Sequence, residues 1–232
     1  MENTNEVRRG AIRYLIILLF QRVIGACLYF FTAGTFMDLR GTTNLMLYLV
    51  ISVISCVIMF FGYQETLNER GKKQENTKGW DKILLPIYWL LGFFGIYFFA
   101  GLSVRLEWSV ISIGWFYLGI FLYLISSVLT IWSVVENKHF ETTSRIQDNR
   151  EQKVITTGPY RIVRHPGYLG ILIWAVASAL MFGTLAVGIV AFIIIVTICI
   201  RTFLEDKMLI NELDGYIEYS KSVKQRLIPF VW

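Results

Sequence analysis

Two short polar segments contain the residue types that could bind a charged small molecule. The first, from Gly158 to Tyr168, reads Gly-Pro-Tyr-Arg-Ile-Val-Arg-His-Pro-Gly-Tyr. Gly158-Pro159 predicts a turn, and Pro166 suits the first position of a helix, where its missing N–H costs nothing. His165 would then lie at a helix N-terminus, where free backbone N–H groups and the helix dipole favour an anion such as a carboxylate. The alternative is a basic turn at a membrane surface with an interfacial tyrosine and a snorkelling arginine.

The second segment is Arg-Thr-Phe-Leu-Glu-Asp-Lys at residues 201–207. Arg201 and Glu205 are four residues apart, so they share one face of a helix. They stand where an apolar run meets water, and ionisable residues at that depth are expensive, which favours a function. The alternative is a simple ion pair that ends the apolar helix. Helical spacing then predicts an amphipathic interfacial helix, which contains Leu209, Leu213, Tyr216 and Ile217.

A few other polar residues are candidates for binding. Gln147 and the run that follows it could offer amide and backbone contacts to a nucleotide; the run is Gln152, Lys153, Val154 and Ile155. His139 and His165 have no cysteine or carboxylate at ligand spacing, which argues against a metal site. The cysteines lie inside apolar runs and are expected to be packing residues: Cys27, Cys56 and Cys199. The sequence has no Ser–His–Asp pattern, Walker loop or Gly-rich dinucleotide motif.

Membrane helices are the elements that must position these segments. Of the 232 residues, 55% are hydrophobic and only 17% are charged, and the mean hydropathy is +0.55. A helix needs about 20 apolar residues to cross a bilayer. We expect an all-α polytopic membrane protein with about six transmembrane helices. They would be four spans and then a short hairpin, at residues 12–36, 45–63, 83–103, 111–135, 166–182 and 184–203.

The distribution of basic residues predicts the orientation of these helices. Lysines and arginines precede the first span and fill the segments 64–82, 137–165 and 201–232, whereas the opposite side keeps only Arg40 and Arg105. The positive-inside rule then places both termini and the polar segments in the cytoplasm, which six spans satisfy and five do not. The same rule explains the net charge of +5 without nucleic-acid binding. The segment 64–82 is expected to be a solvated connector.

These expected elements bring the polar segments together. Residues 137–165 and 201–232 would flank the hairpin on one face of the membrane. A pocket formed by both would open to a soluble cofactor on one side and to lipid on the other. The apolar run after Arg8 and Arg9 continues to about Gly34, which suits a retained span better than a cleaved signal peptide.

The motifs, in this order after four spans, resemble the isoprenylcysteine carboxyl methyltransferase family and its phospholipid methyltransferase relatives. The resemblance covers about Asn137 to the C-terminus. It is carried by Gly-Pro-Tyr at 158–160, Arg-His-Pro-Gly-Tyr at 164–168, and Arg201 with Glu205-Asp206. The remaining matching residues are Leu209, Tyr216, Tyr219, Arg226 and Pro229. Each motif alone is weak, but their joint occurrence is specific.

The resemblance implies methyl transfer from S-adenosylmethionine to a membrane-embedded acceptor, such as the carboxylate of an isoprenylcysteine-like or other lipidic molecule. It implies that residues 137–232 bind the cofactor and that the helices of residues 1–136 face the acceptor. Arg201 matches an acceptor-binding arginine, and Arg201, Glu205 and His165 are the catalytic candidates. The implied cofactor-binding residues are Gln147, Gln152, Lys153, Val154, Ile155, Tyr160, His165, Pro166, Gly167, Tyr168 and Glu205. Gln152 stands where the family often has a histidine, and an amide cannot carry that charge.

Acceptor chemistry leaves several alternatives open. A carboxylate is already ionised and needs only alignment and exclusion of water. A phospholipid amine must lose a proton, so that Glu205, Asp206 or His165 becomes a candidate base. NADPH-dependent sterol-type reductases have a related pattern but typically carry asparagine where this chain has Gly167. A transporter or scaffold is less consistent with expected spans that are nearly free of charge apart from Arg22.

Overall fold

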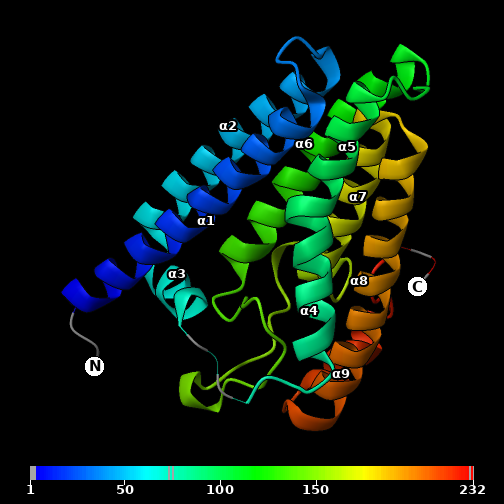
Figure 1. The fold of residues 1–232 in the computed structure, drawn as a ribbon. Helices are drawn as coiled ribbons and strands as arrows, with labels where there is room; N and C mark the ends of the chain where they lie inside the picture. Colours follow the sequence, from blue (N-terminus) through cyan, green and yellow to red (C-terminus); the bar gives the residue numbers. More distant parts are fainter. Residues whose placement is uncertain (1–3, 73, 75, 230, 232) are drawn as a thin grey trace.

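The computed structural model describes residues 4–72, 74, 76–229 and 231, and every regular element in these residues is helical (Figure 1). The α-helices are α1 (Thr4–Ala33), α2 (Leu39–Gly62), α3 (Gln64–Gly71), α4 (Asp81–Trp89), α5 (Ile96–Arg105), α6 (Ile113–Glu136), α7 (Pro166–Phe182), α8 (Leu185–Glu212) and α9 (Tyr216–Ser222). A π-helical turn, η1 (Leu90–Gly95), joins α4 to α5, and two short 3₁₀ helices are η2 (Asp148–Arg150) and η3 (Gly158–Arg161).

Among the described residues, five helices are long and apolar enough to cross a membrane: α1, α2, the continuous α4–η1–α5 helix, α6 and α8. The α7 helix is apolar but shorter, with 17 residues. The prediction of an all-helical polytopic membrane protein is therefore confirmed. The observed helix bounds differ most from the predicted spans in the first and last helices, because α1 begins at Thr4 and α8 continues to Glu212.

The helices run up and down between two ends of the molecule. The start of α1, α3, the segment 137–165 and α9 lie at the lower end in Figure 1, and the α1–α2, α5–α6 and α7–α8 turns lie at the upper end. At the upper end, Arg40 donates to the carbonyls of Met181 and Ile111 at 3.1 and 2.6 Å. The N–H of Ile111 donates to the carbonyl of Gly183 at 2.9 Å. The short α7 thus reaches the same end as the longer helices, as a six-helix crossing pattern requires.

The expectation of a solvated connector at residues 64–82 is wrong. Its first part forms α3, which packs against α1 and buries Thr66, Leu67 and Asn68. Leu67 joins a small apolar cluster at this end of the molecule. The last part ends at Asp81, whose side chain is fully buried beside Arg201. The mixed charge of this segment gave no indication that Leu67 would pack in an apolar cluster or that Asp81 would form a buried ion pair.

The expected amphipathic helix through residues 209–217 is also wrong. Helix α8 ends at Glu212, and Gly215 adopts the left-handed conformation with φ of 79°. Glycine accepts this backbone geometry without a Cβ clash. The chain therefore turns before α9, which buries Tyr216 and Tyr219 against the segment 137–165 instead of laying them in the interface.

Candidate functional site

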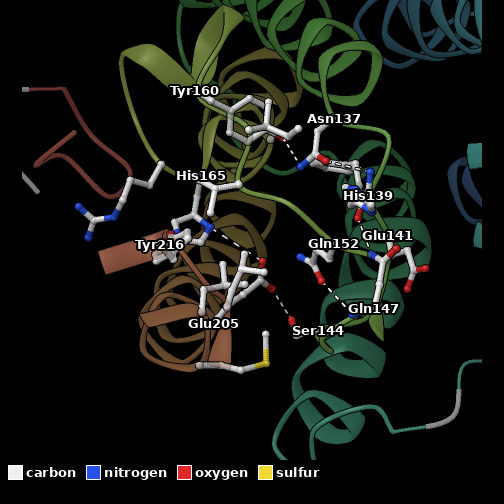
Figure 2. A pocket seen from close by; sticks show the side chains of 18 of the residues that line it. Asn137, His139, Glu141, Ser144, Gln147, Gln152, Tyr160, His165, Glu205 and Tyr216 are labelled. Atoms are coloured by element: carbon white, nitrogen blue, oxygen red, sulfur yellow. Dashed lines mark hydrogen bonds and ion pairs between the residues drawn. The ribbon is translucent and has the colours of Figure 1, made fainter. Parts of the chain in front are cut away.

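A polar pocket lies at the lower end of the molecule, between the segment 137–168 and helices α8 and α9 (Figure 2). Its empty volume is about 790 Å³, including the part open to solvent, which suits a small-molecule ligand. Figure 2 shows Tyr160, His165, Glu205 and Tyr216 on one side and the other labelled residues opposite them, namely Asn137, His139, Glu141, Ser144, Gln147 and Gln152. All lining residues come from Asn137 onward.

The structure brings together the residues predicted to bind a cofactor. Those that line this pocket are Gln147, Gln152, Lys153, Val154, Ile155, Tyr160, His165, Pro166, Gly167, Tyr168 and Glu205. The predicted local geometry is also present, because Gly158–Arg161 forms a 3₁₀ turn and α7 begins at Pro166 with His165 as its N-cap. The roles of these side chains in cofactor binding stay predictions.

Asp206 anchors the wall that carries His165. Its buried carboxylate accepts from Nε and Nη2 of Arg164 at 2.8 Å each, from Nε of Arg226 at 2.8 Å and from the hydroxyl of Tyr216 at 2.9 Å. Nε2 of His165 lies 3.3 Å from Oδ1 of the same carboxylate. With so many donors and no exposure, Asp206 stabilises the turn between η3 and α7. It is therefore a poor candidate for a base.

The neighbouring carboxylate, Glu205, faces the pocket. Its Oε2 accepts from the hydroxyl of Tyr168 at 2.7 Å and from the hydroxyl of Ser144. Its Oε1 lies 3.9 Å from Nδ1 of His165, beyond hydrogen-bond distance, and accepts no hydrogen bond from any other described residue. The ring of His165 stacks on that of Tyr168. One carboxylate oxygen is thus fixed by the protein, and the other remains for a ligand.

The two glutamines mainly shape the opposite wall. Oε1 of Gln152 accepts from the N–H of Gln147 at 2.9 Å, and Nε2 of Gln147 donates to the carbonyl of His139 at 2.7 Å. Oε1 of Gln147 in turn accepts from Arg150 at 2.9 Å. These bonds hold the loop in the conformation that closes the pocket.

His139 and Thr143 are pocket residues that the sequence did not single out. Both ring nitrogens of His139 and the hydroxyl of Thr143 are buried and have no hydrogen-bond partner among the described residues. Burial, assisted by Arg150 and Lys138, lowers the pKa of His139 and favours its neutral ring. Buried polar atoms without partners are rare and call for a ligand or water. A single histidine within an irregular loop carries no sequence pattern that would have identified it.

Arg201 lies outside this pocket and pairs with Asp81 rather than with Glu205. Its Nε and Nη2 donate to the carboxylate of Asp81 at 2.5 and 3.2 Å, and Nη2 also donates to the carbonyl of Thr142 at 2.7 Å. Its guanidinium lies 5.3 Å from the centre of the Tyr168 ring. The alternative interpretation, a simple Arg201–Glu205 ion pair at the end of the apolar helix, is therefore wrong, because Arg201 makes a tertiary contact with the start of α4.

Arg201 lines a second, larger cavity, which we call the apolar cavity. It lies among α1, α2, α3, α4, α6, α7 and α8 and has an empty volume of about 1670 Å³, including its open part. The apolar cavity and the polar pocket share four lining residues: Phe140, Glu141, Gly167 and Tyr168. Gly167 is needed at this junction, because a Cβ there would lie 2.5 Å from Cε2 of Phe140.

Fold and site together define a polytopic helical membrane protein with a polar pocket that adjoins an apolar cavity between its helices. Residues 115–213 match the sequence model of the phospholipid methyltransferase family. This match includes all lining residues of the polar pocket except Tyr216 and Tyr219.

Curated relatives support the same resemblance. The chain is 41% identical over 70 residues to a probable protein-S-isoprenylcysteine O-methyltransferase of Oryza sativa subsp. indica, covering 29% of this chain and 37% of that protein. It is 32% identical over 104 residues to protein-S-isoprenylcysteine O-methyltransferase A of Arabidopsis thaliana, covering 42% and 50%. It is 27% identical over 143 residues to the Arabidopsis B protein, covering 59% and 66%. The chain thus spans well under half the length of the rice relative, and its predicted resemblance to membrane methyltransferases of this kind is confirmed.

Proposed function

We propose that this chain transfers a methyl group from S-adenosylmethionine to the carboxylate of a membrane-embedded acceptor, an isoprenylcysteine-like or other lipidic molecule. The observation that carries the proposal is the junction of the two cavities at Phe140, Glu141, Gly167 and Tyr168. A polar donor and an apolar acceptor must meet while water is kept out, and this junction provides such a place.

The polar pocket fits the donor. Oε1 of Glu205 suits the ammonium group or a ribose hydroxyl of the cofactor, and the unpartnered nitrogens of His139 suit its polar atoms. When bound, S-adenosylmethionine supplies an activated methyl group on a sulfonium. The residues of the chain therefore need only bind and orient it, and we propose that residues 137–232 do so.

The apolar cavity fits an anionic acceptor better than an amine. Among the described residues its lining holds the arginines Arg22, Arg70 and Arg201 and one acid, Glu141. Arg201 is paired with Asp81, and the carboxylate of Glu141 is paired with Arg145 at 3.0 Å, so that Arg22 and Arg70 give the lining its positive charge. Such a cavity attracts a carboxylate and repels a protonated amine. Buried Asp206 is excluded as the base that an amine would require. We therefore keep phospholipid amine methylation as the second candidate only.

Arg70 and Arg201 are the proposed acceptor-binding residues. The guanidinium of Arg70 lies 5.4 Å from the ring of Phe140, which lines both cavities, and its buried Nε has no partner among the described residues. Asp81 occupies Nε and Nη2 of Arg201, so that only its Nη1 remains for an acceptor. Helices of residues 1–136 supply most of the apolar lining, which supports the proposed acceptor role of that part.

The proposed orientation places both termini and the polar pocket on the cytoplasmic side. The support is that the first residues of α1, α3, the segment 137–165 and α9 lie at one end of the molecule (Figure 1). The sequence places many of its lysines and arginines in these segments. A soluble cofactor would then reach the pocket from the cytoplasm.

The proposal is tested by measuring first the binding of the cofactor product and then the transfer of a methyl group. Calorimetry on the purified protein should show binding of S-adenosylhomocysteine and no binding of NADPH. Labelled cofactor should then methylate a farnesylated cysteine with a free carboxylate, but not the same compound as its amide. NADPH binding without S-adenosylhomocysteine binding would replace the proposal by a reductase, and methylation of phosphatidylethanolamine would replace the acceptor class.

A further inference from the structure

A third cavity lies among the helices and contains a partly buried arginine, Arg22. It lies among α1, α2, α4, η1, α6 and α7 and has an empty volume of about 790 Å³, including its open part. Arg22, from the candidate membrane span α1, lines it together with residues from the interiors of the other spans. We call it the Arg22 cavity.

Hydroxyl groups, which can donate and accept hydrogen bonds, make up most of the polar lining of the Arg22 cavity. Besides the guanidinium it presents tyrosine hydroxyls, an indole N–H and small hydroxyls, from Tyr48, Tyr88, Tyr123, Trp174, Ser52, Ser55, Ser126, Ser127 and Thr130. The hydroxyls of Ser52, Ser126 and Ser127 already donate to backbone carbonyls. Neither aspartate nor glutamate is among the described residues that line this cavity.

The charge of Arg22 is only partly compensated by the protein. Its guanidinium carbon lies 4.2 Å from the ring centre of Tyr48 and 5.3 Å from that of Phe93, which are favourable cation–π distances. Its Nε is buried and has no hydrogen-bond partner among the described residues. An ionisable residue inside a membrane span is expensive and normally finds an opposite charge or an acceptor. Since the lining offers no carboxylate, the guanidinium is available to an anionic ligand.

We propose that the Arg22 cavity binds the carboxylate of a lipophilic molecule whose chain lies in the adjoining apolar cavity. The two cavities are continuous, because they share Arg22, Ser52, Ser55, Tyr88, Phe93, Thr130, Ile131 and Ile171. A chain with one charged oxygen-bearing end fits this combination, because the apolar cavity accepts the chain and the guanidinium accepts the anion. The site lies apart from the polar pocket, with which it shares no lining residue.

This inference stands beside the proposed methyl transfer and can be tested without activity. Palmitate and hexadecanol differ at the head group, where only the first carries a charge. We expect palmitate to raise the melting temperature of the detergent-purified protein, to appear bound in native mass spectra, and to bind at least about tenfold more tightly than hexadecanol. Equal binding of acid and alcohol would overturn the proposal.

Variants identify the site. Arg22→Gln should weaken palmitate binding about tenfold or more, Arg22→Lys should retain most of it, and Arg161→Gln, an exposed position outside the described cavities, should not change it. S-adenosylhomocysteine binding to each variant reports its fold separately. If Arg22→Gln does not fold, loss of the acid-over-alcohol preference in Arg22→Lys overturns the proposal, and its retention supports it.

The carboxylate that binds to Arg22 has two possible sources. It is either the head group of a free lipid or a second carboxylate of the acceptor, at the end away from the methylated group. Palmitate that binds through Arg22 without becoming methylated is a separate ligand of the Arg22 cavity. Palmitate that competes with the methylated acceptor marks the cavity as the acceptor's distal end. Palmitate binding that is insensitive to Arg22→Gln has occurred elsewhere and contradicts the proposal. A failure of methyl transfer would not change any of these binding measurements.

Discussion

Glu205 and Asp206 are adjacent on α8, and the structure gives them different environments. Asp206 is fully buried and bonded to Arg164, Arg226 and Tyr216. Glu205 is held at one oxygen by Ser144 and Tyr168 and turns the other toward the polar pocket. Two successive acids thus have separable roles, one in folding and one in the proposed donor binding.

Glu205→Gln should separate these roles. The amide keeps the shape of the side chain but loses the charge that we expect to meet the cofactor. Binding of S-adenosylhomocysteine, measured by calorimetry, should weaken about tenfold or more, with the melting temperature of the free protein nearly unchanged. Asp206→Asn is the matched control and should destabilise the protein by about 3–5 kcal/mol, because it leaves Arg164 buried without its charge partner. Unchanged affinity in Glu205→Gln would remove this residue from the site.

His139 should make stability depend on pH. Burial lowers its pKa from the usual 6.5, so the unfolded chain binds a proton there more readily than the folded protein does. Above pH 6.5 both states are neutral and the effect vanishes; as pH falls below 6.5, the free energy of unfolding should decrease. The melting temperature of His139→Asn, followed between pH 8 and pH 5, should fall less steeply than that of the original protein. Parallel curves would show that His139 does not carry this dependence.

At the scale of the elements, the segment from the end of α2 to the start of α4 forms tertiary contacts with α1 and α8. It contributes α3, which packs on α1, and it delivers Asp81 to Arg201, 120 residues away in sequence. This contact ties the start of α4 to the lower part of α8, and the carbonyl of Thr142 joins it. The segment therefore connects the wall of the apolar cavity to the helix that carries Glu205.

Asp81→Asn tests that connection. It would leave the guanidinium of Arg201 buried without an opposite charge, and we expect a loss of about 3–5 kcal/mol in the free energy of unfolding. Chemical denaturation of the purified protein would measure the loss. The double variant Asp81→Leu with Arg201→Met should recover much of this stability, since paired apolar side chains can replace a buried ion pair. A double variant less stable than Asp81→Asn would contradict the pairing.

Gly167→Ala tests the junction between the cavities at the start of α7. Its Cβ must displace the ring of Phe140, which lines both cavities. We expect methyl transfer to fall about tenfold or more, because small displacements of aligned groups reduce rates strongly. Gly188→Ala on α8 is the matched control, since nothing lies within 4 Å of its added Cβ and alanine favours helices. Equal rates in both variants would contradict the role of the junction.

At the scale of the whole molecule, polar and apolar cavities meet near one end of a helical bundle. Every residue that lines the polar pocket follows residue 136, whereas α1, α2 and α4 supply much of the apolar cavity. Because arginines line the apolar cavity, we expect it to prefer an anionic acceptor to a protonated amine. Donor and acceptor would thus approach from different phases, water and lipid.

Arg70→Gln tests this division of labour. Arg70 belongs to α3 and lines the apolar cavity but not the polar pocket. Removal of its charge should raise the KM for a carboxylate acceptor about tenfold, with S-adenosylhomocysteine affinity unchanged. Titration of the acceptor at saturating cofactor, with calorimetry in parallel, provides both values. An equal loss of acceptor use and cofactor binding would contradict the separation of the two sites.

Short-range patterns in the sequence determined the membrane helices, the turn at Gly158-Pro159, the start of α7 at Pro166 and the hairpin at Gly183. Each of these features depends on local properties of the chain: its apolar content, the missing N–H of proline or the backbone freedom of glycine. Contacts with distant parts of the chain do not change these properties. The motif spacing likewise predicted which residues would gather around the polar pocket.

Only the tertiary structure decided the partners of the charged and polar side chains. Arg201 pairs with Asp81, Glu205 with Ser144 and Tyr168, and Arg22 and His139 retain buried atoms without partners. These outcomes depend on distances between segments far apart in the chain, and a charge buried among helices takes whichever acceptor folding brings near it. Sequence spacing along one helix, which placed Arg201 and Glu205 on one face, contains no information about that competition.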